Sequence, residues 1–144
     1  MSAPGVRPAR EADADTLAAL MTQLGYPSDA AQLRMRLKRA AGDPDVRALV
    51  AEQDGRVVGM IGLMVFHSFV HDQPHGYIMS LVVDESVRGS GAGSSLLAAA
   101  EAWFLERGVD KATLTSHLRR AAAHGFYERR GYEFNGRRYV KSLR

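Results

Sequence analysis

The chain has 144 residues, of which 46% are hydrophobic and 24% charged, and it contains no cysteine. This length and composition predict one globular domain, residues 1–144, with enough apolar surface to fold without disulfides. The lack of cysteine excludes a disulfide framework, a thiolate metal site and a cysteine nucleophile. No apolar run approaches the roughly 18 residues that cross a bilayer, so we expect a cytoplasmic protein that binds no membrane.

The formal net charge is +3, and the basic residues gather at 34–39, 119–120 and 129–144. Two explanations are open: solvated helix faces with a site for one polyanionic small molecule, or a nucleic-acid surface. We favour the first, because the sequence lacks interleaved basic and aromatic residues, and we expect no nucleic-acid partner.

Hydrophobic periodicity and turn residues predict the elements of the first half. In chain order these are a strand at 6–9, a helix that Asp13 or Asp15 caps and that ends at Gly25, a helix from Ser28 to Gly42, and strands at 46–53 and 56–66. Asp54-Gly55 joins the last two strands, and both residues tolerate the positive φ of a two-residue hairpin.

A polar loop at 68–76 then leads into an apolar strand at 77–83 that we expect to be buried on both faces. The remaining predicted elements are a helix at 91–107, a strand at 111–115, a helix at 120–130 closed by Gly131, and a hairpin at 132–140 that turns at Asn135-Gly136. Together they predict a mixed α/β fold. It has one mostly antiparallel, twisted sheet of about six to seven strands, a central strand–helix–strand crossover and flanking helices.

The most informative segment joins the strand at 77–83 to the helix that follows it. Gly89, Gly91 and Gly93 alternate there, and Arg88 precedes them. Glycine lets the backbone approach a ligand closely, and the N–H groups at a helix start attract anions, so the segment favours a diphosphate. A Walker loop would need Gly-Lys-Ser/Thr, and a dinucleotide loop would need glycine where Ser94 stands. The alternative is a connector that only turns the chain.

The segment resembles the acyl-CoA loop of the GNAT superfamily of N-acetyltransferases, in which Arg or Gln is followed after two residues by Gly, one residue, and Gly or Ala. Here these are Arg88, Gly91 and Gly93. The run at 123–133, with its Phe-Tyr pair followed by Gly-Tyr, resembles the C-terminal motif of that family, and the likeness extends over essentially the whole chain.

The resemblance implies a GNAT-like acyl-CoA N-acyltransferase fold. It also implies transfer of an acetyl group from acetyl-CoA, as co-substrate, to a primary amine of a small molecule or protein by direct attack in a ternary complex. The residues that it implies for contact with acetyl-CoA are Leu81, Val82, Val83, Arg88, Gly89, Ser90, Gly91, Ala92, Gly93, Ser94, Arg120 and Ala123. Arg120 stands where relatives often carry Asn, so it either contacts the phosphates or is a solvated residue at a helix start.

Tyr127 matches the tyrosine that serves as general acid in the family. A phenol with a pKa of about 10 is protonated at neutral pH and can give its proton to a leaving thiolate. The alternative is an amphipathic core residue. The base is open, because the strand lacks the carboxylate that many relatives place there; His75, Asp72, Glu52 and a water relay are the candidates.

His67, His71 and His75 with Asp72 invite a metal interpretation, but they fall across a strand end and a loop where four-residue spacing does not converge side chains. We expect no metal. A non-catalytic acyl-CoA-binding or sensor module is the second functional hypothesis. The sequence leaves open the acceptor amine, the acyl-chain preference and whether the chain forms a homodimer through its C-terminal strands.

Overall fold

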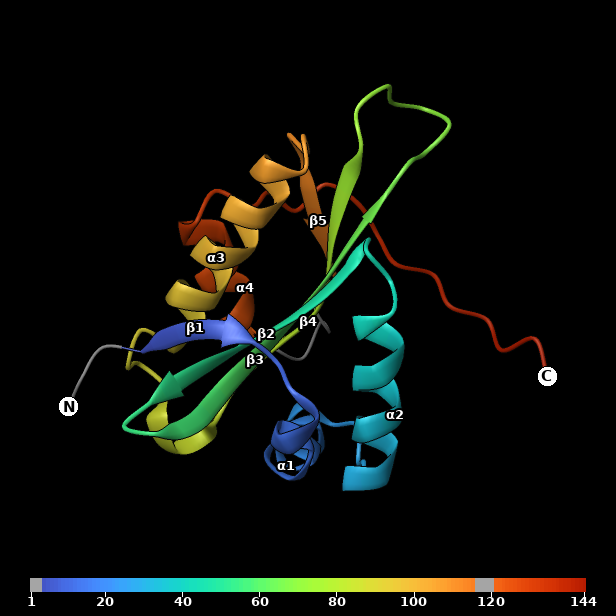
Figure 1. Cartoon of the computed structure of the whole chain (residues 1–144). Coiled ribbons are helices and arrows are strands. Elements are labelled where there is room, and N and C mark those ends of the chain that lie inside the picture. Colours follow the sequence, from blue (N-terminus) through green and yellow to red (C-terminus); the bar gives the residue numbers. More distant parts are fainter. Residues whose placement is uncertain (1–3, 116–120) are drawn as a thin grey trace. The chain divides into compact units, whose positions relative to one another are not determined.

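The computed structural model describes residues 4–115 and 121–144 (Figure 1). The chain divides into two compact units, one ending at Thr113 and one beginning at Leu114, and each is described by itself. The elements, in order, are β1 (Gly5–Pro8), η1 (Glu11–Asp13), α1 (Ala14–Leu24), α2 (Ala30–Ala41), β2 (Val46–Gln53), β3 (Arg56–Phe66), β4 (His75–Val83), η2 (Glu85–Val87), α3 (Ala92–Glu106), β5 (Ala112–Leu114) and α4 (Ala121–Arg129).

The sheet has the strand order β1-β2-β3-β4-β5, and the pairs β1–β2, β2–β3 and β3–β4 are antiparallel. Asp54 and Gly55 both adopt positive φ, 52° and 77°, between β2 and β3, so the predicted hairpin turn is confirmed. The chain passes from β4 through α3 to β5, its neighbour in the sheet. This confirms the predicted strand–helix–strand connection, and it places the glycine segment between β4 and α3.

Helices cover both faces of this sheet. A Cβ atom added to Gly59 would lie 3.1 Å from Leu96 of α3, so this face of β3 lies directly under α3. The next residue, Met60, packs instead against the buried cluster that α1 and α2 form with the sheet. Since successive residues of a strand point to opposite faces, α3 lies on one side of the sheet and α1 and α2 lie on the other.

α2 begins at Ala30, two residues after the predicted start at Ser28, and the residue that caps it is Asp29. The Asp29 carboxylate accepts a hydrogen bond from the N–H of Gln32, and the Gln32 side chain accepts one from the N–H of Asp29. This reciprocal pair is a capping box.

Asp13, which was predicted to cap α1, makes no capping hydrogen bond. Its buried carboxylate instead accepts two hydrogen bonds of 2.9 Å from the Arg7 guanidinium and one of 2.8 Å from the N–H of Arg10. These contacts lower the pKa of Asp13, most strongly through Arg7, and they raise the pKa of Arg7. The pair ties β1 to the start of α1.

The C-terminal hairpin is the main error of the sequence analysis. Gly131, with φ 86°, closes α4 as predicted, but residues 132–144 form no strand. In the described part of the chain the sheet therefore has five strands and not six to seven. Asn135-Gly136 permits a turn, but a two-stranded hairpin is marginal by itself. Among the described residues, no helix has the length and apolar character that a membrane span requires.

Candidate functional site

The glycine segment wraps around the N-terminal end of α3. Gly89 and Gly91 adopt φ values of 88° and 93°, in the left-handed region that favours glycine. A Cβ atom added to either residue would meet no heavy atom within 4 Å, so space remains open beside the loop. Backbone conformation, and not tight packing, is therefore what requires glycine at these two positions.

The start of α3 is suited to an anion. Gly91 occupies the N-cap position, where it has no side chain to accept from the N–H groups of the first turn. Next to it, the hydroxyl oxygen of Ser90 is buried and has no hydrogen-bond partner within the described residues. An unsatisfied buried polar atom costs about 1–3 kcal/mol, and a phosphate oxygen would remove that cost.

Arg88 supplies the positive charge. Its side chain is exposed, and within the described ranges its guanidinium makes no hydrogen bond or ion pair. A guanidinium can bind two phosphate oxygens at once, so Arg88, the Ser90 hydroxyl and the N–H groups of the first turn of α3 together fit a diphosphate.

Residues 84–86, which precede the glycine segment, are stabilised by contacts that the sequence analysis did not identify. The Asp84 carboxylate accepts hydrogen bonds from the N–H and the hydroxyl of Ser86, at 3.0 and 2.9 Å, and these bonds lower the pKa of Asp84. The Gln23 side chain of α1 accepts the N–H of Glu85 at 3.0 Å. The Asp-x-Ser spacing is a local turn signal that a sequence can show, whereas nothing local points to Gln23.

The strand before the loop, β4, has two features that suit an extended ligand. First, it spans nine residues beside the three-residue β5, so in the described structure most of that edge of β4, including Leu81–Val83, has no strand beside it. Leu81 and Val82 are buried and Val83 is half-buried, so their side chains pack while backbone groups on this edge stay open to pairing.

Second, β4 contains a bulge. Gly62 of β3 pairs with Ser80, but the next residue, Leu63, pairs with Ile78, which leaves Met79 as an extra residue. Bulges re-aim side chains and occur often beside active sites. Met79 is 44% exposed and Tyr77 and Ser80 are half-buried, so the prediction that this strand is buried on both faces is wrong for this part of it. α1 and α2 end short of this region, which sequence periodicity does not reveal.

Tyr127 lies on α4 in the second unit, where a helix was predicted. Its ring makes edge contacts with Phe126 and Tyr132, with centroids 5.4 and 6.1 Å apart. Its carbonyl oxygen accepts the N–H groups of Arg130 and Tyr132 as the helix ends. Ala123 lies on the same helix, one turn earlier. Arg120, for which a phosphate contact was considered, lies outside the described residues.

The three base candidates have different surroundings. Glu52 accepts a 2.7 Å hydrogen bond from Nε of Arg7, and Asp72 is exposed in the loop between β3 and β4. His75 is the first residue of β4, with one ring nitrogen on the hydroxyl of Thr113. Burial, followed by the charges of His71 and Lys111, lowers the pKa of His75 below its usual value.

Two of the three histidines lie close together, although the sequence analysis expected these side chains not to converge. The rings of His71 and His75 stack with centroids 6.1 Å apart, and Phe66 packs against His75 at 5.3 Å. Over the described residues, no group of three or more His, Asp or Glu side chains could hold a metal ion.

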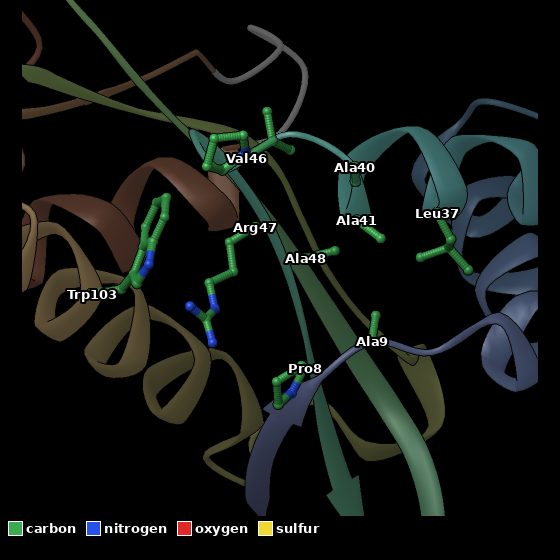
Figure 2. Close-up of a pocket in the computed structure, with 10 residues that line it drawn as sticks. Pro8, Ala9, Leu37, Ala40, Ala41, Val46, Arg47, Ala48 and Trp103 are labelled. Carbon is green, nitrogen blue, oxygen red and sulfur yellow. The ribbon is translucent and has the colours of Figure 1, made fainter.

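A hollow of about 270 Å³ lies elsewhere, where β2 continues past the end of β1. Figure 2 shows Arg47 and Trp103 on one side of it and Ala48, Ala41 and Leu37 on the other. Trp103 lies near the opposite end of α3 from the glycine segment, roughly 16 Å along the helix at 1.5 Å per residue. The hollow is therefore not part of the anion site.

Comparison with known proteins adds independent findings. Residues 14–132 match the model of the Acetyltransferase (GNAT) family. Over 101 residues, 70% of this chain and 66% of the relative, the sequence is 39% identical to aminoalkylphosphonate N-acetyltransferase of Salmonella typhimurium. Over 136 residues, 92% of this chain and 88% of the relative, it is 31% identical to aminoglycoside N(6')-acetyltransferase type 1 of Stenotrophomonas maltophilia.

The fold also matches solved structures. An aminoglycoside N-acetyltransferase, AAC(6')-Iy in complex with CoA, superposes with a TM-score of 0.88 at 17% identity, covering 100% of this chain and 97% of that one. A GNAT family acetyltransferase of Staphylococcus aureus gives 0.83 at 23% identity, covering 99% and 100%. These likenesses establish the fold.

Proposed function

The chain belongs to the GNAT family of acetyltransferases, and from that premise we propose that this N-acetyltransferase uses acetyl-CoA and passes its acetyl group directly to a primary amine in a ternary complex. One observation carries the choice of donor. The glycine segment combines an uncapped helix start, an unpartnered buried hydroxyl at Ser90 and an unpaired guanidinium at Arg88, all in the described first unit.

In this proposal the donor contacts two parts of the chain. The diphosphate lies on Arg88, Gly89, Ser90, Gly91, Ala92, Gly93 and Ser94, and the pantetheine pairs with the open backbone edge of Leu81–Val83. This second contact adds an extended ligand to a sheet edge, a mode in which main-chain hydrogen bonds supply affinity. It needs no particular side chains, which agrees with the purely apolar sequence there.

The transfer itself needs an acid and a base. The amine nitrogen forms a bond to the thioester carbonyl carbon, the carbon–sulfur bond breaks, and the sulfur leaves with the electron pair. The nitrogen then gives up its second proton, which balances the proton that the sulfur receives. We assign Tyr127 as the acid that protonates the departing sulfur, since a phenol is protonated at neutral pH. Without a cysteine in the chain, a cysteinyl acyl-enzyme is excluded.

We assign the base role to His75. The incoming ammonium must lose a proton before it can attack, and a neutral imidazole can accept that proton. Its lowered pKa keeps His75 uncharged at neutral pH. Glu52 is a weaker candidate because its carboxylate is already engaged in an ion pair with Arg7, and Asp72 because it lies exposed in the loop between β3 and β4.

Relatives with known names support an amine acceptor of small size: one is named for aminoalkylphosphonates and another for aminoglycosides. The first test is thiol release from acetyl-CoA in the presence of a panel of primary amines. Tyr127→Phe should lower kcat at least about a hundredfold and leave the CoA dissociation constant within about twofold. Tyr139→Phe, at an 85% exposed tyrosine of the same unit, is the matched control.

The outcomes separate the hypotheses. Unchanged kcat in Tyr127→Phe would remove the acid assignment. Calorimetric binding of CoA without turnover of any amine would favour a non-catalytic acyl-CoA sensor, and absence of any heat with CoA would refute the donor.

A further inference from the structure

One face of the β3–β4 hairpin extends beyond the cover of α1 and α2 (Figure 1). Strand register puts Met64 opposite Tyr77, Phe66 opposite His75 and Gly62 opposite Ser80. Because side chains alternate along a strand, these residues share a face. We call it the hairpin face, and its side chains are Met64, Phe66, His75, Tyr77, Met79 and Ser80.

Side-chain contacts confirm that these residues share a face. The Phe66 and His75 rings meet at 5.3 Å, and the Ser80 hydroxyl lies 3.8 Å from the sulfur of Met60. A Cβ atom added to Gly62 would lie 2.9 Å from the Ser80 oxygen and 3.9 Å from the Met79 methyl carbon. Gly62, which has no side chain, therefore lies beneath the Ser80 and Met79 side chains, and the bulge places the Met79 side chain on the hairpin face.

The face combines apolar side chains (Met64, Phe66 and Met79) with uncharged polar or titratable ones (His75, Tyr77 and Ser80), and it is partly open to solvent. Phe66 is 36% exposed and Met79 is 44% exposed, whereas Leu63, Val65 and Ile78, which point to the opposite side of the sheet, are buried. Exposed apolar side chains that lie next to one another mark candidate ligand-binding surfaces. On β4 the same face continues at Val82, so it borders the strand edge assigned to the donor.

We propose that the hairpin face binds the body of the acceptor, and that this body is apolar or aromatic and carries a single amino group close to His75. The inference rests on the proposed function and specifies its substrate class.

Charge supports this class of acceptor. None of the six side chains of the hairpin face is a carboxylate. The charged groups that act on His75 are His71, Lys111 and Asp110, so its surroundings do not carry a net negative charge. A polycationic amine would bring several charges onto a surface with no carboxylate to pair them, which is costly. Methionine and aromatic side chains adapt to apolar and aromatic groups and gain sulfur–aromatic contacts.

The test compares primary amines with different bodies: an aromatic monoamine, a small polar monoamine and a polycationic aminoglycoside. Steady-state thiol release is measured with acetyl-CoA and 2-phenylethylamine, ethanolamine or tobramycin. We expect 2-phenylethylamine to have the highest kcat/KM, by at least about tenfold, which is the discrimination that apolar contacts commonly give. Met79→Gln and Met64→Gln should each raise KM for 2-phenylethylamine at least about fivefold, with KM for ethanolamine unchanged. Met35→Gln, at a 64% exposed methionine of α2, is the matched control and should behave as wild type.

Several results would overturn the inference. One is a preference for tobramycin, and another is equal KM changes for 2-phenylethylamine and ethanolamine in Met79→Gln. A third is a face occupied by a second copy of the chain, seen as a dimer that Met79→Gln converts to monomer with amine KM unaltered.

If no amine releases thiol, the proposed function fails, and calorimetry with 2-phenylethylamine in the presence of CoA then decides on the face. Binding of 2-phenylethylamine that is lost in Met79→Gln and retained in Met35→Gln would support an acceptor site on the hairpin face. Absence of binding to the wild type would overturn it.

Discussion

Replacing Gly91 by alanine tests the anion site with the smallest chemical change. Gly91 has φ 93° and caps α3, and an added Cβ atom would meet no heavy atom within 4 Å. The change therefore introduces no clash, and only the backbone preference of an L residue opposes the observed conformation. That preference costs about 1–2 kcal/mol.

The same conformational cost sets the expected loss of CoA affinity in Gly91→Ala. Gly91 is exposed, so the free protein can relieve the strain by shifting the loop, and CoA must restore the loop to bind. A penalty of about 1–2 kcal/mol corresponds to about 5-fold to 30-fold weaker binding. Gly108 provides the control, because it has φ 76°, equally open space and a place at the other end of α3. Gly108→Ala should cost similar stability without changing CoA affinity.

Isothermal titration calorimetry at fixed pH and salt measures the affinity, with pantetheine as a second ligand that lacks the diphosphate. We expect Gly91→Ala to weaken CoA and to leave pantetheine unchanged. Equal CoA affinity in Gly91→Ala and wild type, or an equal loss for both ligands, would show that this loop does not hold the diphosphate.

Three further outcomes follow from the described contacts. Asp13→Asn should lower the free energy of unfolding by about 2–3 kcal/mol in urea titrations at pH 7, with exposed Asp15→Asn nearly neutral. Because folding lowers the pKa of Asp13, its contribution is present above about pH 4 and is lost as pH falls through the folded pKa, so the variant and wild type should converge in acid. In the wild type, kcat/KM should fall at acid pH as the imidazole of His75 becomes protonated, below the usual pKa of histidine. His75→Gln should remove this acid limb of the pH profile, and His67→Gln should keep it. An acid limb retained in His75→Gln would exclude His75 as the base. Arg88→Gln should weaken CoA about tenfold at low salt and less at high salt, and a salt-independent loss would argue against a charge contact.

Several features were predictable because they are local. The turn at Asp54-Gly55, the helix end at Gly131 and the glycine segment before α3 each depend on backbone conformations that only a few residue types adopt easily. The β-rich runs on either side of Asp54-Gly55 similarly predicted the bounds of β2 and β3 without error. The family itself was recognisable from Arg88 and the glycines for the same reason.

Other features depend on which segments meet, and sequence periodicity carries no such information. Asp13 could have capped α1, but β1 brings Arg7 to it, and a bidentate ion pair is a stronger partner than a helix N–H. The C-terminal run has the composition of a hairpin, yet strands need a neighbouring strand for their hydrogen bonds, and pattern alone does not supply one.

The sequence by itself therefore determined the backbone conformation of the glycine segment, because its glycines lie within a few residues of each other and permit positive φ there. The tertiary structure decided which strand face stays open. The bulge at Met79 arises from pairing between β3 and β4, and the exposure of the hairpin face arises because α1 and α2 end before they reach it. Both depend on contacts between residues distant in the sequence.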